Sequence, residues 1–115
     1  MYTESDQIHR IWEMVDTDCF VLSQCDQEYL PLLDSWIEKL RVGDEQFFSS
    51  CMEYFYGIQN KSFKKLTCHV EKTYLIWALL KFNGNQSRAA RFLSIDYKTL
   101  ARKMRAYNIK VDTDG

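Results

Sequence analysis

The chain has 115 residues, the size of one domain, which excludes a multidomain enzyme. Its content of 46% hydrophobic and 15% aromatic residues is enough for a packed core and excludes a fully disordered chain. The net charge of -1 hides a split, because residues 1–60 hold three bases against twelve acids and residues 61–115 hold twelve bases against four acids. This asymmetry predicts an anionic partner for the second half.

With one proline and four glycines, the sequence has few turn signals, which favours helices over several short strands. The first predicted helix is capped by Ser5. Its apolar residues, spaced to form one buried stripe, are Ile8, Ile11, Trp12 and Val15. The second helix spans about residues 28–41, with Pro31 in its first turn and Gly43 after its end. Its apolar face consists of Leu33, Trp36, Ile37 and Leu40. Between the two helices, residues 19–22 form a short apolar run that fits either a strand or a turn.

Two longer helices are predicted in the middle of the chain. The third spans about residues 44–56 and is ended by Gly57. The fourth spans about residues 62–82, with Gly84 just past its end, where a residue with left-handed backbone belongs. From residue 74 to residue 80 this helix is apolar on nearly every side, so it must be covered from more than one direction. Either other helices of the chain or a symmetric partner chain could cover it.

After Gly84 the sequence predicts two short helices joined by a tight turn. Asn85 is placed to cap the first helix and Asp96 to cap the second. The small residues Ala89 and Ala90 allow the two helices to cross closely. The apolar side chains expected to pack between them are Phe92, Leu93, Ile95, Leu100 and Met104. This arrangement is a helix-turn-helix pattern.

The side chains left outside that apolar wedge predict a DNA-binding surface. Residues 83–110 carry seven bases against the single acid Asp96. A recognition helix enters the major groove with its N-terminal side chains at base edges, while cations further along neutralise phosphates. The free amides of Gln86 and Ser87, at the start of the first short helix, predict a phosphate clamp. On the second short helix, the predicted contact residues are Tyr97, Lys98, Arg102, Lys103 and Arg105.

The stretch from Gly84 to Tyr107, G-N-Q-S-R-A-A-R-F-L-S-I-D-Y-K-T-L-A-R-K-M-R-A-Y, resembles the bacterial Fis family, the factor for inversion stimulation. The same helix-turn-helix ends activators of the NtrC type. The resemblance covers roughly residues 44–110 and is strongest from Val70 onward. It implies an all-α helical bundle with a C-terminal helix-turn-helix, in which two chains intertwine as a homodimer. The residues assigned to that dimer interface are Phe55, Phe63, Leu66, Val70, Tyr74 and Trp77.

The resemblance also implies roles for individual residues. Asn85, Gln86 and Ser87 would hold phosphates, and Thr99, Arg102 and Lys103 would contact the DNA backbone. Tyr97 would face the groove where Fis has an arginine, so the sequence preference of Fis is not carried over. From the residues alone, Tyr97 fits a base contact, a phosphate contact or simple packing equally well. Other departures from Fis are Ser94, Asp96 and Ala101. The full set of expected DNA-binding residues is Asn85, Gln86, Ser87, Arg88, Tyr97, Lys98, Thr99, Arg102, Lys103 and Arg105.

We divide the chain into an acidic helical extension (residues 1–42), Fis-like dimerisation helices with the helix-turn-helix (residues 43–110) and a tail (residues 111–115). The extension could cover the basic helices, dock a protein partner or be an inert solubilising face. The predicted function is that of a homodimeric bacterial transcriptional regulator or nucleoid-associated factor in the cytoplasm. It would bind double-stranded DNA with a sequence preference and insert its recognition helices, about residues 96–107, into successive major grooves. The alternative is a protein-interaction regulator that binds another transcription factor through residues 1–42.

Several other kinds of site are not expected from this sequence. Four cysteines and two histidines form no C-x-x-C or H-x-x-x-H pair, so we expect no metal. We expect no signal peptide and reduced cysteines, and no membrane span, because the apolar stretch of residues 74–80 is too short. Adjacent residues of a helix point apart, so Cys68 and His69 do not form a catalytic pair. With no paired carboxylates or glycine-rich phosphate loop, we expect neither enzyme activity nor a cofactor.

Overall fold

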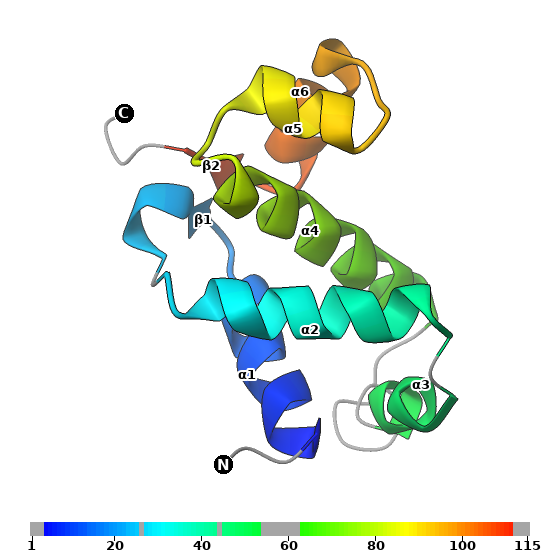
Figure 1. Ribbon diagram of the computed structural model, residues 1–115. Helices are drawn as coiled ribbons and strands as arrows, with labels where there is room; N and C mark the ends of the chain where they lie inside the picture. Colours follow the sequence, from blue (N-terminus) through cyan, green and yellow to red (C-terminus); the bar gives the residue numbers. More distant parts are fainter. Residues whose placement is uncertain (1–3, 26, 44, 54–62, 112–115) are drawn as a thin grey trace.

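The computed structural model describes residues 4–25, 27–43, 45–53 and 63–111 (Figure 1). Their helices are α1 (Glu4–Val15), α2 (Tyr29–Arg41), α3 (Glu45–Met52), α4 (Phe63–Lys81), α5 (Gln86–Phe92) and α6 (Tyr97–Ala106). The other elements of the described residues are a 3₁₀ turn, η1 (Leu22–Gln24), and two short strands, β1 (Phe20–Val21) and β2 (Ile109–Lys110). The predicted all-α class is confirmed.

The first two helices form as their apolar spacing predicts. All four predicted apolar residues of α1 are buried, as are Leu33, Trp36 and Ile37 of α2. Helix α1 begins at Glu4, so Ser5 lies inside it and the prediction that Ser5 is its cap is wrong. Helix α2 ends as predicted, because Gly43 has a φ of 70° and its N–H donates to the Leu40 carbonyl at 3.3 Å.

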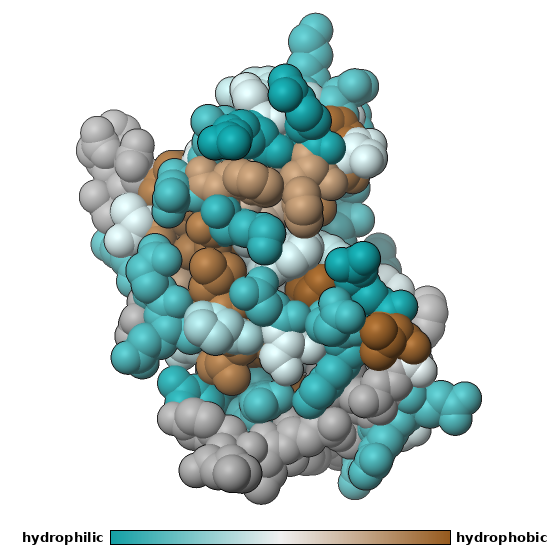
Figure 2. Space-filling view, viewed as in Figure 1, coloured by the Kyte–Doolittle hydropathy of each residue, from teal (hydrophilic) through white to brown (hydrophobic). Residues whose placement is uncertain are grey.

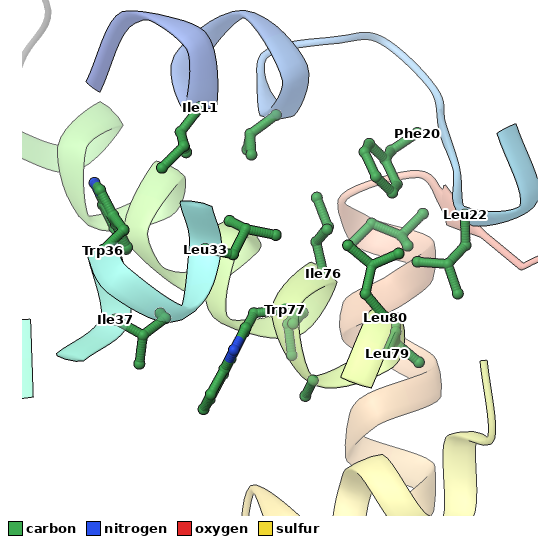
Figure 3. Close-up of a cluster of buried hydrophobic side chains, with 14 of the residues drawn as sticks. Ile11, Phe20, Leu22, Leu33, Trp36, Ile37, Ile76, Trp77, Leu79 and Leu80 are labelled. Atoms are coloured by element: carbon green, nitrogen blue, oxygen red, sulfur yellow. The ribbon is translucent and has the colours of Figure 1, made fainter. Parts of the chain in front are cut away.

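Helix α4 is the central element, and both α1 and α2 pack against it (Figure 1). Every residue from Leu75 to Leu80 is buried, so the prediction that this stretch needs cover on several sides is confirmed. Helices of the same chain provide that cover. Figure 3 shows Ile11 of α1, Leu33 of α2 and Ile76 of α4 directed into one shared core. Burial of α4 therefore gives no independent argument for a partner chain.

The apolar run at residues 19–22 contains both predicted alternatives, a strand and a turn. Strand β1 pairs in parallel with β2, with Phe20 opposite Ile109. The Phe20 N–H donates to the Asn108 carbonyl at 3.0 Å, and Asn108 Nδ2 donates to the Asp18 carbonyl at 2.7 Å. This small sheet, absent from the sequence prediction, ties the connection after α1 to the segment that follows α6.

Polar contacts also join the predicted extension to α4. The Lys72 ammonium donates to the Thr17 carbonyl at 3.0 Å, just beyond the end of α1. The Trp77 indole N–H donates to Asp34 Oδ1 on α2 at 2.6 Å. The sequence interpretation separates residues 1–42 from residues 43–110. In the structure both ranges contribute to the same core, and specific hydrogen bonds join them.

The buried His69 predicts a pH-dependent stability. Its ring lies 4.7 Å from that of Trp12 and 6.2 Å from that of Trp36. Desolvation, followed by the charge of Lys72, lowers the pKa of His69 from 6.5 to about 3. Between these two pKa values, His69 is protonated in the unfolded chain and neutral in the folded chain. The free energy of unfolding therefore has its full value above pH 6.5 and decreases as the pH falls towards 3. Between about pH 7.5 and about pH 5, we expect this group to lower the free energy of unfolding by roughly 2 kcal/mol.

Urea unfolding at both pH values measures this effect. The His69→Gln variant should show a flatter dependence on pH than the parent chain, although it is less stable overall. Equal slopes in the parent and in His69→Gln would contradict the assignment.

Candidate nucleic-acid interface

The helix-turn-helix starts at a glycine that the backbone requires. Gly84 has a φ of 82°, and its N–H donates to the Leu79 carbonyl at 2.8 Å, which closes the end of α4. A Cβ at this position would lie 2.8 Å from Val111 Cγ1 and 3.4 Å from Leu22. The predicted left-handed residue is thus confirmed, and the two segments around β1 and β2 leave little room for a side chain there.

Helix α5 is held by its cap and by its small residues. Asn85 Oδ1 accepts a hydrogen bond from the Arg88 N–H at 3.1 Å, so the predicted cap is confirmed. Ala89 and Ala90 are fully or almost fully buried, where their small side chains let α5 approach its neighbours closely. Ser94 follows with a φ of 60°, and the Ile95 N–H donates to the Ala90 carbonyl at 3.0 Å. The turn therefore forms with a serine in a conformation that favours glycine.

Helix α6 is anchored by Leu100 and Met104, which are buried as predicted. Asp96 stands at its N-cap position with extended backbone, but its side chain makes no cap hydrogen bond there. The predicted bonding by Asp96 is therefore wrong, although the helix begins where expected. Phe92 is also misplaced in the sequence prediction, because it is 44% exposed. Its ring contacts Phe82 at 5.3 Å rather than filling the wedge between α5 and α6.

The outer face of α6 carries most of the predicted contact residues together. Tyr97 is 51% exposed, and Lys98, Arg102 and Arg105 are exposed, while Thr99 is half-buried. At the start of α5, Ser87 and Arg88 are exposed, and Gln86 is half-buried. Figure 2 shows hydrophilic side chains gathered over the end of the molecule that α5 and α6 form. This end can present cations to a polyanion while the apolar side of α6 stays in the core.

Lys103 is the exception among the predicted phosphate contacts. Its ammonium lies 3.0 Å from Glu71 Oε1, so it points back towards α4. Sequence reasoning missed Glu71 altogether. Glu71 is one of four acids in the basic half of the chain, and no helical spacing connects it to a residue 32 positions later.

The residues assigned to a dimer interface are only partly described. Phe55 lies outside the described residues, as do the side chains of Phe63 and Leu66. Val70 and Tyr74 are half-buried. Trp77 is only 7% exposed because it packs within its own chain and bonds to α2.

Two further observations concern other kinds of site. Within the described part of the chain, no three histidine, cysteine, aspartate or glutamate side chains come together as a metal site would need. The helices of that part also include none that is long and apolar enough to cross a bilayer.

Comparison with known proteins agrees with the geometry of this end of the molecule. Residues 69–107 match the family model described as bacterial regulatory protein, Fis family. The match begins within the first half of α4 and includes α5 and α6. Neither the curated proteins nor the solved structures gave a match. The family model describes a DNA-binding type of regulator rather than a class of enzyme. Over residues 69–107, which contain a helix-turn-helix, the chain is therefore similar to the Fis family of bacterial regulatory proteins.

Proposed function

We propose that this protein is a bacterial transcriptional regulator or nucleoid-associated factor that binds double-stranded DNA in the cytoplasm. In this proposal α6 enters the major groove, and side chains at the start of α5 contact the phosphates. The observation that carries it is the division of α6 into two faces. Lys98, Arg102 and Arg105 are exposed, whereas Leu100 and Met104 are buried.

Individual roles follow from position along α6. In the proposal, Tyr97 in the first turn would reach base edges with Lys98 beside it, and Thr99 would contact the DNA backbone. Arg102 and Arg105, further along, would neutralise phosphates. Asn85, Gln86, Ser87 and Arg88 would contact the backbone from α5. Since Tyr97 cannot form the bidentate guanine contact of an arginine, the preferred DNA sequence should differ from that of Fis.

The proposal includes a homodimer, in which two recognition helices read half-sites about one helical turn apart. Trp77 is engaged within its own chain, so Val70 and Tyr74, with the predicted Phe55, Phe63 and Leu66, would form the interface. Sedimentation at several concentrations tests this part separately. A mass equal to that of one chain at all concentrations would contradict the proposed dimer but not the proposed DNA binding.

A protein partner is also proposed for residues 1–42. Because Trp12 and Trp36 are buried, such a partner would meet exposed acidic side chains of α1 and α2, such as Glu13 and Glu38. Protein binding without DNA binding would favour the alternative function over the primary one.

Replacing Arg102 by glutamine tests the primary function. The parent chain should bind a labelled duplex with an affinity that falls steeply as salt rises. Because each phosphate contact contributes about 0.9 to the log-log salt slope, Arg102→Gln should reduce the magnitude of the slope by about that amount. Fluorescence anisotropy at several salt concentrations measures both quantities.

Arg41→Gln is the matched control, since Arg41 is an exposed arginine at the end of α2 and near Glu38. It should leave the slope unchanged. Absence of parent binding at low salt would overturn the proposed function, as would equal slopes for the Arg102 and Arg41 variants.

A further inference from the structure

Glu71 of α4 forms a polar junction with α6. Its Oε1 atom accepts a hydrogen bond from Lys103 Nζ at 3.0 Å and another from the Tyr107 hydroxyl at 2.7 Å. Lys103 lies near the end of α6, and Tyr107 is its C-cap residue. One carboxylate oxygen thus joins α4 to two points on α6 that are a helical turn apart.

The face of α6 that hydrogen-bonds to Glu71 is not the face that is exposed to solvent. Lys103 and Tyr107 are four residues apart, so they share a face of the helix. Lys98 and Arg102, also four residues apart, share a different and exposed face. Lys103 therefore belongs with the inward-facing residues, even though its charge resembles that of its neighbour Arg102.

The protonation states favour this junction at neutral pH. The hydrogen bond from Tyr107 lowers the pKa of Glu71, and Lys103 adds to this effect against the opposing influence of desolvation. Desolvation, followed by the hydrogen bond to Glu71, raises the pKa of Tyr107. At neutral pH the Glu71 carboxylate is thus ionised and accepts both hydrogen bonds. The Tyr107 hydroxyl stays protonated and can donate one of them.

We propose that Glu71 is a positioning residue for the recognition helix and that it holds Lys103 away from the DNA phosphates. This inference rests on the proposed DNA-binding function. Glu71 Oε1 accepts hydrogen bonds from two residues that are one helical turn apart on α6. Together these two hydrogen bonds oppose rotation of α6 about its own axis. Such a rotation would change where Tyr97 and Lys98 point, so Glu71 acts on the groove contacts through α6 and does not touch DNA itself.

Salt dependence of DNA binding distinguishes this role from a phosphate contact by Lys103. Lys103→Gln should leave the log-log salt slope nearly unchanged, whereas Arg102→Gln should reduce it by about 0.9. Glu71→Gln should increase the slope by up to about 0.9, because the freed ammonium becomes available to a phosphate. A reduction by Lys103→Gln equal to that of Arg102→Gln would overturn the proposal, and so would an unchanged slope in Glu71→Gln.

A second measurement tests the junction without DNA. The urea midpoints of Glu71→Gln, Tyr107→Phe and the double variant form a cycle, with a second cycle for Lys103→Gln. In each cycle the losses should be less than additive, because either substitution weakens or removes the same contact. Additive losses in both cycles would overturn the inference. If the cycles show coupling but the parent chain binds no DNA, the proposed function fails together with the role in positioning for DNA, while the junction itself remains.

Discussion

Replacing Gly84 by alanine is expected to lower the free energy of unfolding by about 2–5 kcal/mol. The left-handed backbone at a φ of 82° accounts for about 1–2 kcal/mol of this loss with any L-residue. The new Cβ would also lie 2.8 Å from Val111 Cγ1. Forcing an extra methyl into such a packed position costs about 1–3 kcal/mol. Urea unfolding followed by circular dichroism measures the loss.

Gly43 provides the matched control for Gly84. Its φ is 70°, but a Cβ there would have no heavy atom within 4 Å. Gly43→Ala should therefore show only the backbone component, about 1–2 kcal/mol. Adding Val111→Ala to Gly84→Ala should remove part of the steric component. Equal losses at the two glycines would contradict the close packing of Val111 against the end of α4.

Leu33→Ala is expected to lower the free energy of unfolding of the whole protein by about 2–5 kcal/mol, as for other fully buried leucines. Leu33 lies on α2, within the segment that the sequence interpretation treats as an extension, yet it shares one core with Leu79 and Leu100. Because the core is continuous, the helix-turn-helix should lose stability together with α1 and α2. Unfolding followed by tryptophan fluorescence and by amide signals from α6 should show coincident transitions.

Val42→Ala controls for a change on α2 that leaves the core intact. Val42 is 68% exposed just past the end of this helix, so its truncation should change the free energy of unfolding by at most about 0.5 kcal/mol. If Leu33→Ala shifted the fluorescence transition but left the α6 signals unchanged, residues 1–42 and 43–110 would be separate folding units. That result would support the division drawn from sequence.

The parts of the fold that sequence predicts correctly are those determined within one or two helical turns. The spacing of Ile8, Ile11 and Val15 is enough to specify the buried face of α1, because helical geometry alone brings those side chains together. Asn85 can likewise be identified as a cap, since its partner, the Arg88 N–H, is three residues away. The match of residues 69–107 to the Fis family covers such a locally determined region.

The parts that sequence does not predict depend on contacts between distant residues. An apolar surface around α4 shows that Ile76 and Leu79 must be buried, but it carries no information on which helix buries them. Charge alone does not separate Lys103 from Arg102, because the difference is made by Glu71 on another helix. The exact packing of Phe92 also depends on Phe82 and Trp77. In each case the deciding partner comes from outside the local sequence.

The pairing of β1 with β2 has a consequence for how the chain folds. Phe20 and Ile109 are 89 residues apart in the sequence, and bringing such distant points together costs roughly 4 kcal/mol in chain entropy by the (3/2)RT ln n estimate. Contacts of this range slow folding, whereas helices form in microseconds or less. Helices α5 and α6 should thus form early. Their final packing against α4 should form only when β1, in the connection after α1, pairs with β2. During synthesis, the segment around Phe20 must wait for its partner, so the orientation of the recognition helix is expected to be among the last features acquired.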